Sequence, residues 1–145
     1  MLDRDNNRLV IFDAEEALSL HGQSAPYIQY AHARACRILE RAGGPPDLDA
    51  AAPGLADLTE QEINLVQQIA ALPTEVQRAA REYKPLVIAT YAYNLAVRTT
   101  DFYEHCRVLD APEPQRTARL ALVAAARQAL AAALGLLGIA APEAM

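Results

Sequence analysis

Ser24-Ala-Pro-Tyr-Ile-Gln-Tyr-Ala-His-Ala-Arg34 has the residue spacing of an amphipathic α-helix. Ser24 suits the N-cap, and Pro26 suits the first turn, where its missing N–H costs nothing. At about 100° per residue, one face of this helix is apolar. That face holds Ile28, Ala31, Ala35, Ile38, Leu39 and Ala42. Glycines and prolines at 43–46 predict that the helix ends at about Ala42.

The neighbouring face of this helix combines aromatic rings with cations. It carries Tyr27, Tyr30, Arg34, Arg37 and Arg41. A helix with these two faces can lie on a bundle and present flat π surfaces and guanidinium planes, the groups that hold unstacked RNA bases. The same spacing also describes tyrosines at the rim of a core beside solvated arginines. The spacing alone leaves both interpretations open.

The rest of the sequence predicts an all-α fold, a helical bundle of about five helices. Thr59-Glu-Gln-Glu62 has the pattern of a capping box, and Pro73 ends the helix that this box opens. Long helices are expected over residues 24–42, 85–109 and 115–137, with shorter ones over 13–20, 59–72 and 74–83. The helix over 85–109 is apolar on two faces, so we expect it to be buried between its neighbours.

The chain is expected to form one domain over residues 1–145. Residues 1–22 are expected to be a lead-in segment, extended or irregular over its first twelve residues. Residues 43–57 are rich in Gly, Pro, Ala and Asp, which predicts a flexible loop.

The composition favours a packed protein of a reducing compartment. Of the 145 residues, 52% are hydrophobic, enough for a sizeable core. No apolar run approaches the ~20 residues that cross a bilayer, and the charged N-terminus lacks the apolar core of a signal peptide. Cys36 and Cys106 are too few for a disulfide framework. We therefore expect a cytoplasmic protein with no membrane partner.

The net charge argues against binding to RNA by simple electrostatic attraction. The chain carries a net charge of −5 and has a pI near 5.1, whereas neutralising a phosphate backbone needs a basic face. Basic residues are nevertheless clustered, and the three clusters are Arg34, Arg37 and Arg41; Arg78, Arg81 and Lys84; and Arg116, Arg119 and Arg127. We expect this chain alone to bind RNA weakly, with most of the affinity coming from elsewhere in a larger protein.

Four segments carry motifs that are found together elsewhere: Asn7–Leu20, Ala25–Arg34, Asp101–Val108 and Leu136–Met145. The second resembles PYLQYAHAR, the third FYxxxxV and the fourth LLGI-P-x-M, which are motifs of the C-terminal helical domain of arginyl-tRNA synthetases. The first is similar to the lead-in of that domain, which is called the DALR anticodon-binding domain. The resemblance spans the chain and implies the bundle of class Ia synthetase anticodon-binding domains. Thr99-Thr100 departs from it, since many members have Phe-Asn there.

The resemblance also implies a site for the anticodon loop of arginine tRNA, whose middle anticodon base is a cytosine. The implied tRNA anticodon-binding residues are Tyr27, Arg34, Tyr103, Arg107 and Met145. Tyr103 would stack on a base, Arg107 would cover or hydrogen-bond one, and Arg34 would donate to cytosine or phosphate. Met145 would close the pocket with a soft apolar contact. A core role for Tyr103 remains an equal alternative.

No catalytic or metal site is expected in this chain. It has a single lysine, Lys84, and no Gly-rich phosphate loop or nucleophile beside a base. Four residues could in principle supply zinc ligands: His32, Cys36, His105 and Cys106. However, adjacent helical residues such as His105 and Cys106 point about 100° apart, so they rarely bind one metal ion together. The resemblance implies no cofactor here, with ATP used by the catalytic domain of the parent enzyme, an arginine–tRNA ligase.

The implied partners are arginine tRNA and the catalytic domain of the parent synthetase, and we expect a monomer. Two alternatives remain: a free-standing domain of the same type, and a helical protein–protein scaffold without RNA binding, which the acidic charge favours slightly. The opening Met1-Leu-Asp-Arg4 is typical of the middle of a protein and Pro142-Glu-Ala-Met145 of a true terminus. We therefore expect a chain truncated at its N-terminal side.

Overall fold

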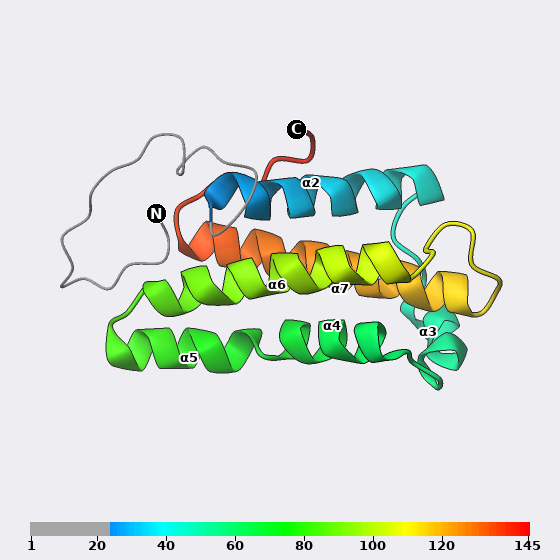
Figure 1. The fold of residues 1–145 in the computed structure, drawn as a ribbon, viewed down its shortest axis with the longest axis horizontal. Coiled ribbons are helices and arrows are strands. Elements are labelled where there is room, and N and C mark those ends of the chain that lie inside the picture. The colour runs from blue at the N-terminus through cyan, green and yellow to red at the C-terminus, as the bar shows by residue number, and fades with distance from the viewer. Residues whose placement is uncertain (1–23) are drawn as a thin grey trace.

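The computed structural model describes residues 24–145, and over this range the fold is entirely helical (Figure 1). The elements in order are α2 (Ala25–Ala42), α3 (Leu48–Ala51), the 3-10 helix η1 (Ala52–Leu55), α4 (Glu60–Ala70), α5 (Leu72–Glu82), α6 (Leu86–His105) and α7 (Gln115–Leu136). The prediction of an all-α bundle with three long helices is confirmed for this part of the chain. The lead-in segment and short helix predicted within residues 1–22 lie outside the described residues.

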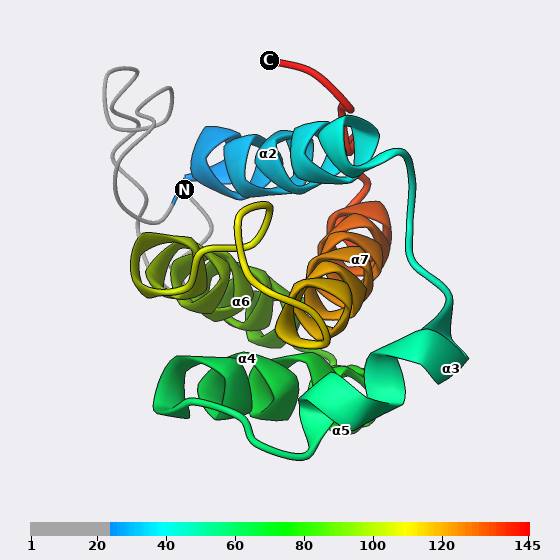
Figure 2. The ribbon, with the colours of Figure 1, turned by 90° about the vertical axis from the view of Figure 1, so that its right-hand side faces the viewer.

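The helices pack in three layers. Helices α6 and α7 lie together in the middle, α2 packs on them from one side, and α4 and α5 follow each other along the opposite side (Figures 1 and 2). The side chains of Leu95 and Phe102 on α6 and Leu130 on α7 are fully buried. Since α6 contacts α2, α4, α5 and α7, the prediction that the helix over 85–109 is buried between its neighbours is confirmed.

Helix α2 begins and ends as its sequence predicts. The Ser24 hydroxyl accepts a hydrogen bond from the Tyr27 N–H at 3.3 Å, and Pro26 lies in the first turn. Gly43 adopts the left-handed conformation at φ 91°, and the Gly44 N–H donates to the Leu39 carbonyl at 2.8 Å. These caps satisfy backbone groups that a helix end leaves without partners.

Local signals also explain the two helices on the far side. The Thr59 hydroxyl accepts from the Glu62 N–H, and the Glu62 carboxylate accepts from the Thr59 N–H at 2.7 Å, which completes the predicted capping box. Helix α5 begins at Leu72 with Pro73 in its first turn, two residues earlier than predicted, because proline is tolerated there. It ends at Tyr83, which has the left-handed φ of 52°.

The flexible loop predicted over residues 43–57 is wrong for residues 48–55, which form α3 and η1. The Asp47 carboxylate accepts from the Asp49 N–H at 3.0 Å and so caps α3. Ala51 and Gly54 are buried, and α3 and η1 both pack on α7. The same small residues that suggested a loop permit this close approach.

Gly54 should tolerate no side chain, because a Cβ at this position would lie 2.7 Å from the Cβ of Ala118 and closer still to the Pro114 carbonyl oxygen. We expect Gly54→Ala to lower the free energy of unfolding by about 1–2 kcal/mol, the usual cost of overpacking. Gly135→Ala is the matched control, since nothing lies near that Cβ, and it should stabilise α7 by up to about 1 kcal/mol. Urea denaturation measures both, and equal effects would contradict the close packing of η1 on α7.

Helix α7 is long and apolar enough to cross a membrane by length and composition alone. Half of its most apolar stretch is buried inside the bundle, where its residues pack against α2, α4 and α6. The core helix of a soluble protein has the same properties, so this feature is weak support for a membrane span.

Candidate nucleic-acid interface

The guanidinium group of Arg34 lies over the ring of Tyr103, with the Arg34 Cζ 5.0 Å from the ring centroid. Arg34 is exposed on α2, and Tyr103 is half-buried in the last turn of α6 beside the ring of Phe102. This is the geometry of a cation–π contact. The aromatic ring is thus anchored in the bundle on one side and covered by an exposed cation on another.

The hydroxyl of Tyr103 is buried and has no hydrogen-bond partner within the described residues. Burial raises the pKa of Tyr103 well above its ordinary value, and the charge of Arg34 offsets only part of this effect. The hydroxyl therefore remains protonated and able to donate. Leaving such a group unpaired costs about 1–3 kcal/mol.

Met145 reaches the same place from the other end of the chain. Together with Ala144 it borders a small hollow of about 60 Å³ on α2. The α2 residues around the hollow are Tyr30, Ala33, Arg34 and Arg37. Arg34 therefore contacts the Tyr103 ring and also lines the hollow beside Met145. Of the three residues that the resemblance assigned to one site, Arg34 is thus the common neighbour of Tyr103 and Met145.

Tyr27 and Arg107 are placed differently. The Tyr27 hydroxyl donates to the Thr100 Oγ1 at 3.4 Å, and its ring centroid lies 5.7 Å from that of Tyr93. Tyr27 is thus a half-buried rim residue against α6, about 10 Å along α2 from Arg34. Arg107 is exposed just beyond the end of α6, and its carbonyl accepts from the Arg119 Nη1 at 2.8 Å.

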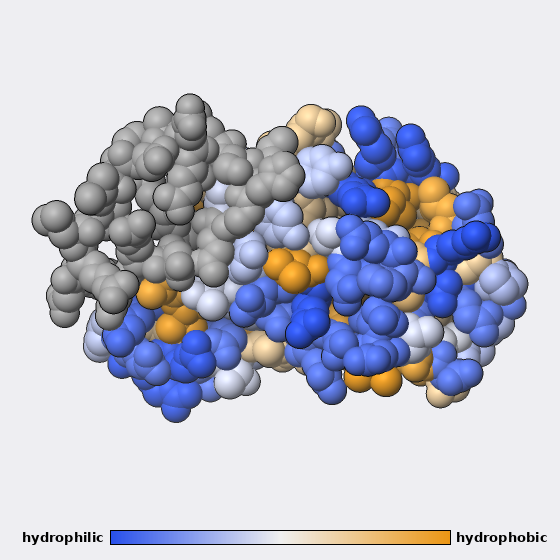
Figure 3. All heavy atoms as spheres, in the orientation of Figure 1, coloured by the Kyte–Doolittle hydropathy of each residue, from blue (hydrophilic) through white to orange (hydrophobic). Residues whose placement is uncertain are grey.

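The outer face of α2 carries cations that no carboxylate of residues 24–145 pairs with. Arg34, Arg37 and Arg41 are exposed, and none of them forms an ion pair within residues 24–145. Tyr30 is exposed on the same helix. Strongly hydrophilic residues gather over the C-terminal half of α2 in Figure 3. This face supplies the local positive charge that the net charge of the chain does not.

A buried ion pair, which the sequence did not predict, supports the position of Arg107. The Arg119 Nε donates to the Glu62 Oε1 at 2.7 Å, and Glu62 is only 3% exposed. Burial alone would raise the pKa of Glu62, but hydrogen bonds from Arg119 and Thr59 outweigh it and hold that pKa below its usual value. The capping box indicated a role for Glu62 within α4, whereas its partner on α7 is brought close only by the fold.

The candidate zinc ligands are not gathered. The His32 Nδ1 lies 2.8 Å from the Pro142 carbonyl and 3.8 Å from the Cys36 Sγ. Cys106 is buried at the end of α6, next to the exposed His105. Across residues 24–145, no group of three or more His, Cys, Asp or Glu side chains is arranged to hold a metal ion.

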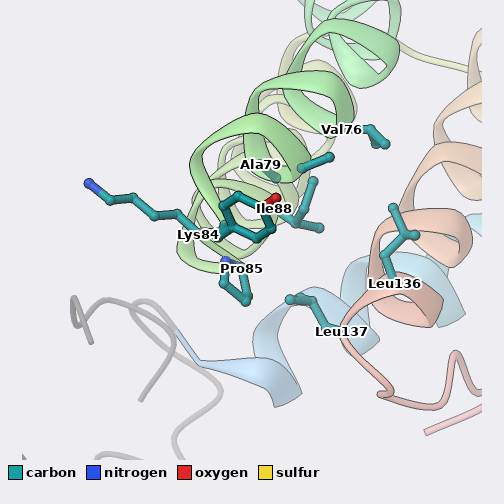
Figure 4. A pocket seen from close by; sticks show the side chains of 9 residues that line it. Val76, Ala79, Lys84, Pro85, Ile88, Leu136 and Leu137 are labelled. Carbon is teal, nitrogen blue, oxygen red and sulfur yellow. The ribbon is translucent and has the colours of Figure 1, made fainter.

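A separate pocket of about 410 Å³ opens at the turn between α5 and α6, against the end of α7 (Figure 4). Its walls are mainly apolar and include Val76, Ile88 and Leu137. None of the five predicted site residues lines it. Its chemistry suits apolar packing, whereas the Arg34 site combines cations with an aromatic ring.

Over residues 24–145 the fold defines a class of protein, the all-helical domain. Residues 28–145 match the family model described as the DALR anticodon binding domain, and the chain belongs to this family. It is 49% identical over 140 residues to an arginine–tRNA ligase of Methanothrix thermoacetophila, and the matched region covers 96% of the chain and 24% of the ligase. It is 42% identical to the corresponding ligase of Pyrococcus abyssi, covering 100% of the chain and 23% of that protein.

Solved structures agree with this assignment. Arginyl-tRNA synthetase of Thermus thermophilus superimposes with a TM-score of 0.80 at 41% identity, over 92% of this chain and 23% of that one. A putative arginyl-tRNA synthetase from Campylobacter jejuni superimposes with a TM-score of 0.84 at 26% identity, over 99% of this chain and 32% of that one. The chain thus spans about a quarter of the length of the curated relatives it matches.

Proposed function

We propose that this chain binds the anticodon loop of arginine tRNA, as one domain of an arginine–tRNA ligase. The observation that carries the proposal is the guanidinium of Arg34, which covers the Tyr103 ring and lines the hollow beside Met145. Bases of RNA loops are held by aromatic rings and guanidinium planes of this kind. The family assignment and the names of the relatives support the same function.

The geometry refines the role of each residue. Since Arg34 covers the Tyr103 ring, we propose that a base stacks on the outer face of the guanidinium rather than directly on the ring. Met145 supplies a soft apolar contact from the edge of the hollow. Arg37 and Arg41 supply positive charge for the phosphates, and Arg107 contacts a neighbouring part of the loop. Tyr27 supports α2 against α6 and is not expected to touch RNA.

The remaining steps of the reaction belong to the parent protein. We propose that its catalytic domain uses ATP to attach arginine to tRNA, and that the present domain needs no cofactor. The parent would act in the cytoplasm, where translation takes place. Because the chain carries a net charge of −5, the isolated domain should bind tRNA more weakly than the parent does.

A titration tests this function. The probe is a fluorescent anticodon stem–loop of arginine tRNA, and the control is the same stem–loop with its middle anticodon cytosine changed to uracil. We expect the changed loop to bind about tenfold more weakly, within the range of one lost base contact. No binding of either loop would contradict the proposal and favour a protein–protein scaffold. Equal binding of the two loops would contradict recognition of the middle anticodon cytosine.

A further inference from the structure

The end of the chain is folded back onto the helix that carries Arg34. Gly138 has a left-handed φ of 70°, and the Ile139 N–H donates to the Leu134 carbonyl at 2.9 Å, which ends α7 and reverses the chain. The segment 139–145, here called the C-terminal tail, then passes α2 and ends beyond it (Figures 1 and 2). The position of Met145 therefore depends on how this tail is held.

Two side chains of α2 bind the backbone of the tail. The Gln29 Nε2 donates to the Ala140 carbonyl at 2.8 Å, and the His32 Nδ1 lies 2.8 Å from the Pro142 carbonyl. A carbonyl oxygen only accepts, so the Nδ1 of His32 carries the proton in this bond. Gln29 and His32 are three residues apart, hence on one face of α2, and they engage alternate carbonyls of the tail.

The rest of the tail has little else to hold it. Ile139 and Ala141 pack partly against the core, but Glu143, Ala144 and Met145 are exposed. The final anchor before these three residues is the carbonyl of Pro142. Exposed chain ends without such anchors are usually poorly ordered.

We propose that Gln29 and His32 are positioning residues that clamp the C-terminal tail, so that Met145 is held beside Arg34 for the RNA. This inference rests on the proposed function. It assigns a purpose to two polar residues of α2 that are not among the five predicted site residues. His32 is a buried histidine that acts as a hydrogen-bond donor to backbone.

The first test measures the tail without RNA. The chain contains two methionines, Met1 and Met145, so methyl-labelled methionine gives two NMR signals, and a Met145→Leu variant identifies one of them. In the Gln29→Leu/His32→Gln variant, which adds no further methionine, the Met145 signal should move to the position seen in a short peptide ending in Glu-Ala-Met. His32→Asn keeps a donor at the place of Nδ1 and should retain the native signal. An unmoved signal in the double variant would overturn the clamp.

The second test measures binding of the anticodon stem–loop. The double variant should bind about 3- to 10-fold more weakly, the scale of one or two lost hydrogen bonds. Gln77→Leu, on the exposed face of α5, is the matched control and should bind normally. In chains that lack residues 143–145, the same double variant should change affinity by less than about twofold, because a clamp can act only through the tail that it holds.

The outcomes separate the two proposals. If the wild-type chain binds the stem–loop and the double variant binds it equally well, the positioning role is wrong while the proposed function stands. Equal losses with and without residues 143–145 would show that the substitutions act on α2 itself, which also overturns the role. If the wild-type chain binds no RNA, the proposed function fails and the positioning role fails with it, whatever the NMR signal shows.

Discussion

Arg119→Met should lower the free energy of unfolding at neutral pH by about 3 kcal/mol, the cost of leaving a buried carboxylate without its partner. Glu62 is 3% exposed and accepts the Arg119 Nε at 2.7 Å. Methionine fills much of the volume of arginine but donates no hydrogen bond, so the charge of Glu62 remains desolvated. Guanidinium chloride denaturation of the wild type and the variant measures the difference.

The matched control is Arg119→Met combined with Glu62→Gln. A glutamine at position 62 can still accept from the Thr59 N–H and complete the capping box, but it brings no buried charge. The double variant should therefore recover a large part of the lost stability. A double variant as unstable as Arg119→Met would indicate that the lost packing of the arginine stem, rather than the stranded charge, causes the effect.

The pH dependence of this stability difference follows from the pKa of Glu62. The folded protein holds that pKa below the ordinary value of 4.5, so the contribution of the ion pair is present above pH 4.5 and is lost as the pH falls through the folded pKa. In Arg119→Met the carboxylate is buried without a cation, and protonation relieves it. The stability gap between wild type and variant should accordingly begin to narrow above pH 4.5, where the stranded carboxylate of the variant takes up a proton. It should go on narrowing until the pH falls through the lowered pKa of Glu62 in the folded wild type.

Short-range signals made most of the fold predictable. Ser24, Pro26 and the Thr59–Glu62 capping box fix the starts of helices through backbone groups within one turn, and they act as expected. Pro73 was expected to end a helix, whereas α4 ends at Ala70 and Pro73 lies in the first turn of α5. The segment 48–55 was missed because its helical turns are stabilised by contact of Ala51 and Gly54 with α7 rather than by its own composition.

The site was predictable only in part. The family motifs identified Arg34, Tyr103 and Met145, and the fold brings them together. The ion pair of Glu62 with Arg119 and the bonds from Gln29 and His32 to the tail join residues far apart in the sequence. No local pattern marks such a pair, since each partner alone is an ordinary polar residue of a helix.

Tyr103→Ala should weaken binding of the arginine anticodon stem–loop by about 5- to 150-fold, which corresponds to one stacking contact of about 1–3 kcal/mol. Without the ring, the guanidinium of Arg34 loses the surface that holds it 5.0 Å from the centroid. The same substitution removes a half-buried ring that packs beside Phe102, so the melting temperature should fall as well. Alanine alone therefore cannot distinguish an RNA-binding tyrosine from a core tyrosine.

Tyr103→Phe makes that distinction, because it keeps the ring and the Arg34 contact and removes only the buried hydroxyl. That hydroxyl has no partner in the described part of the chain, so its loss should leave the protein as stable or up to about 1 kcal/mol more stable. If the hydroxyl donates to a base once RNA is bound, the affinity for the stem–loop should fall about 3- to 10-fold, a single hydrogen bond. Stability and affinity would then change in opposite directions, which a residue that serves only the core cannot produce. Unchanged affinity in Tyr103→Phe would restrict the role of Tyr103 to supporting the guanidinium of Arg34.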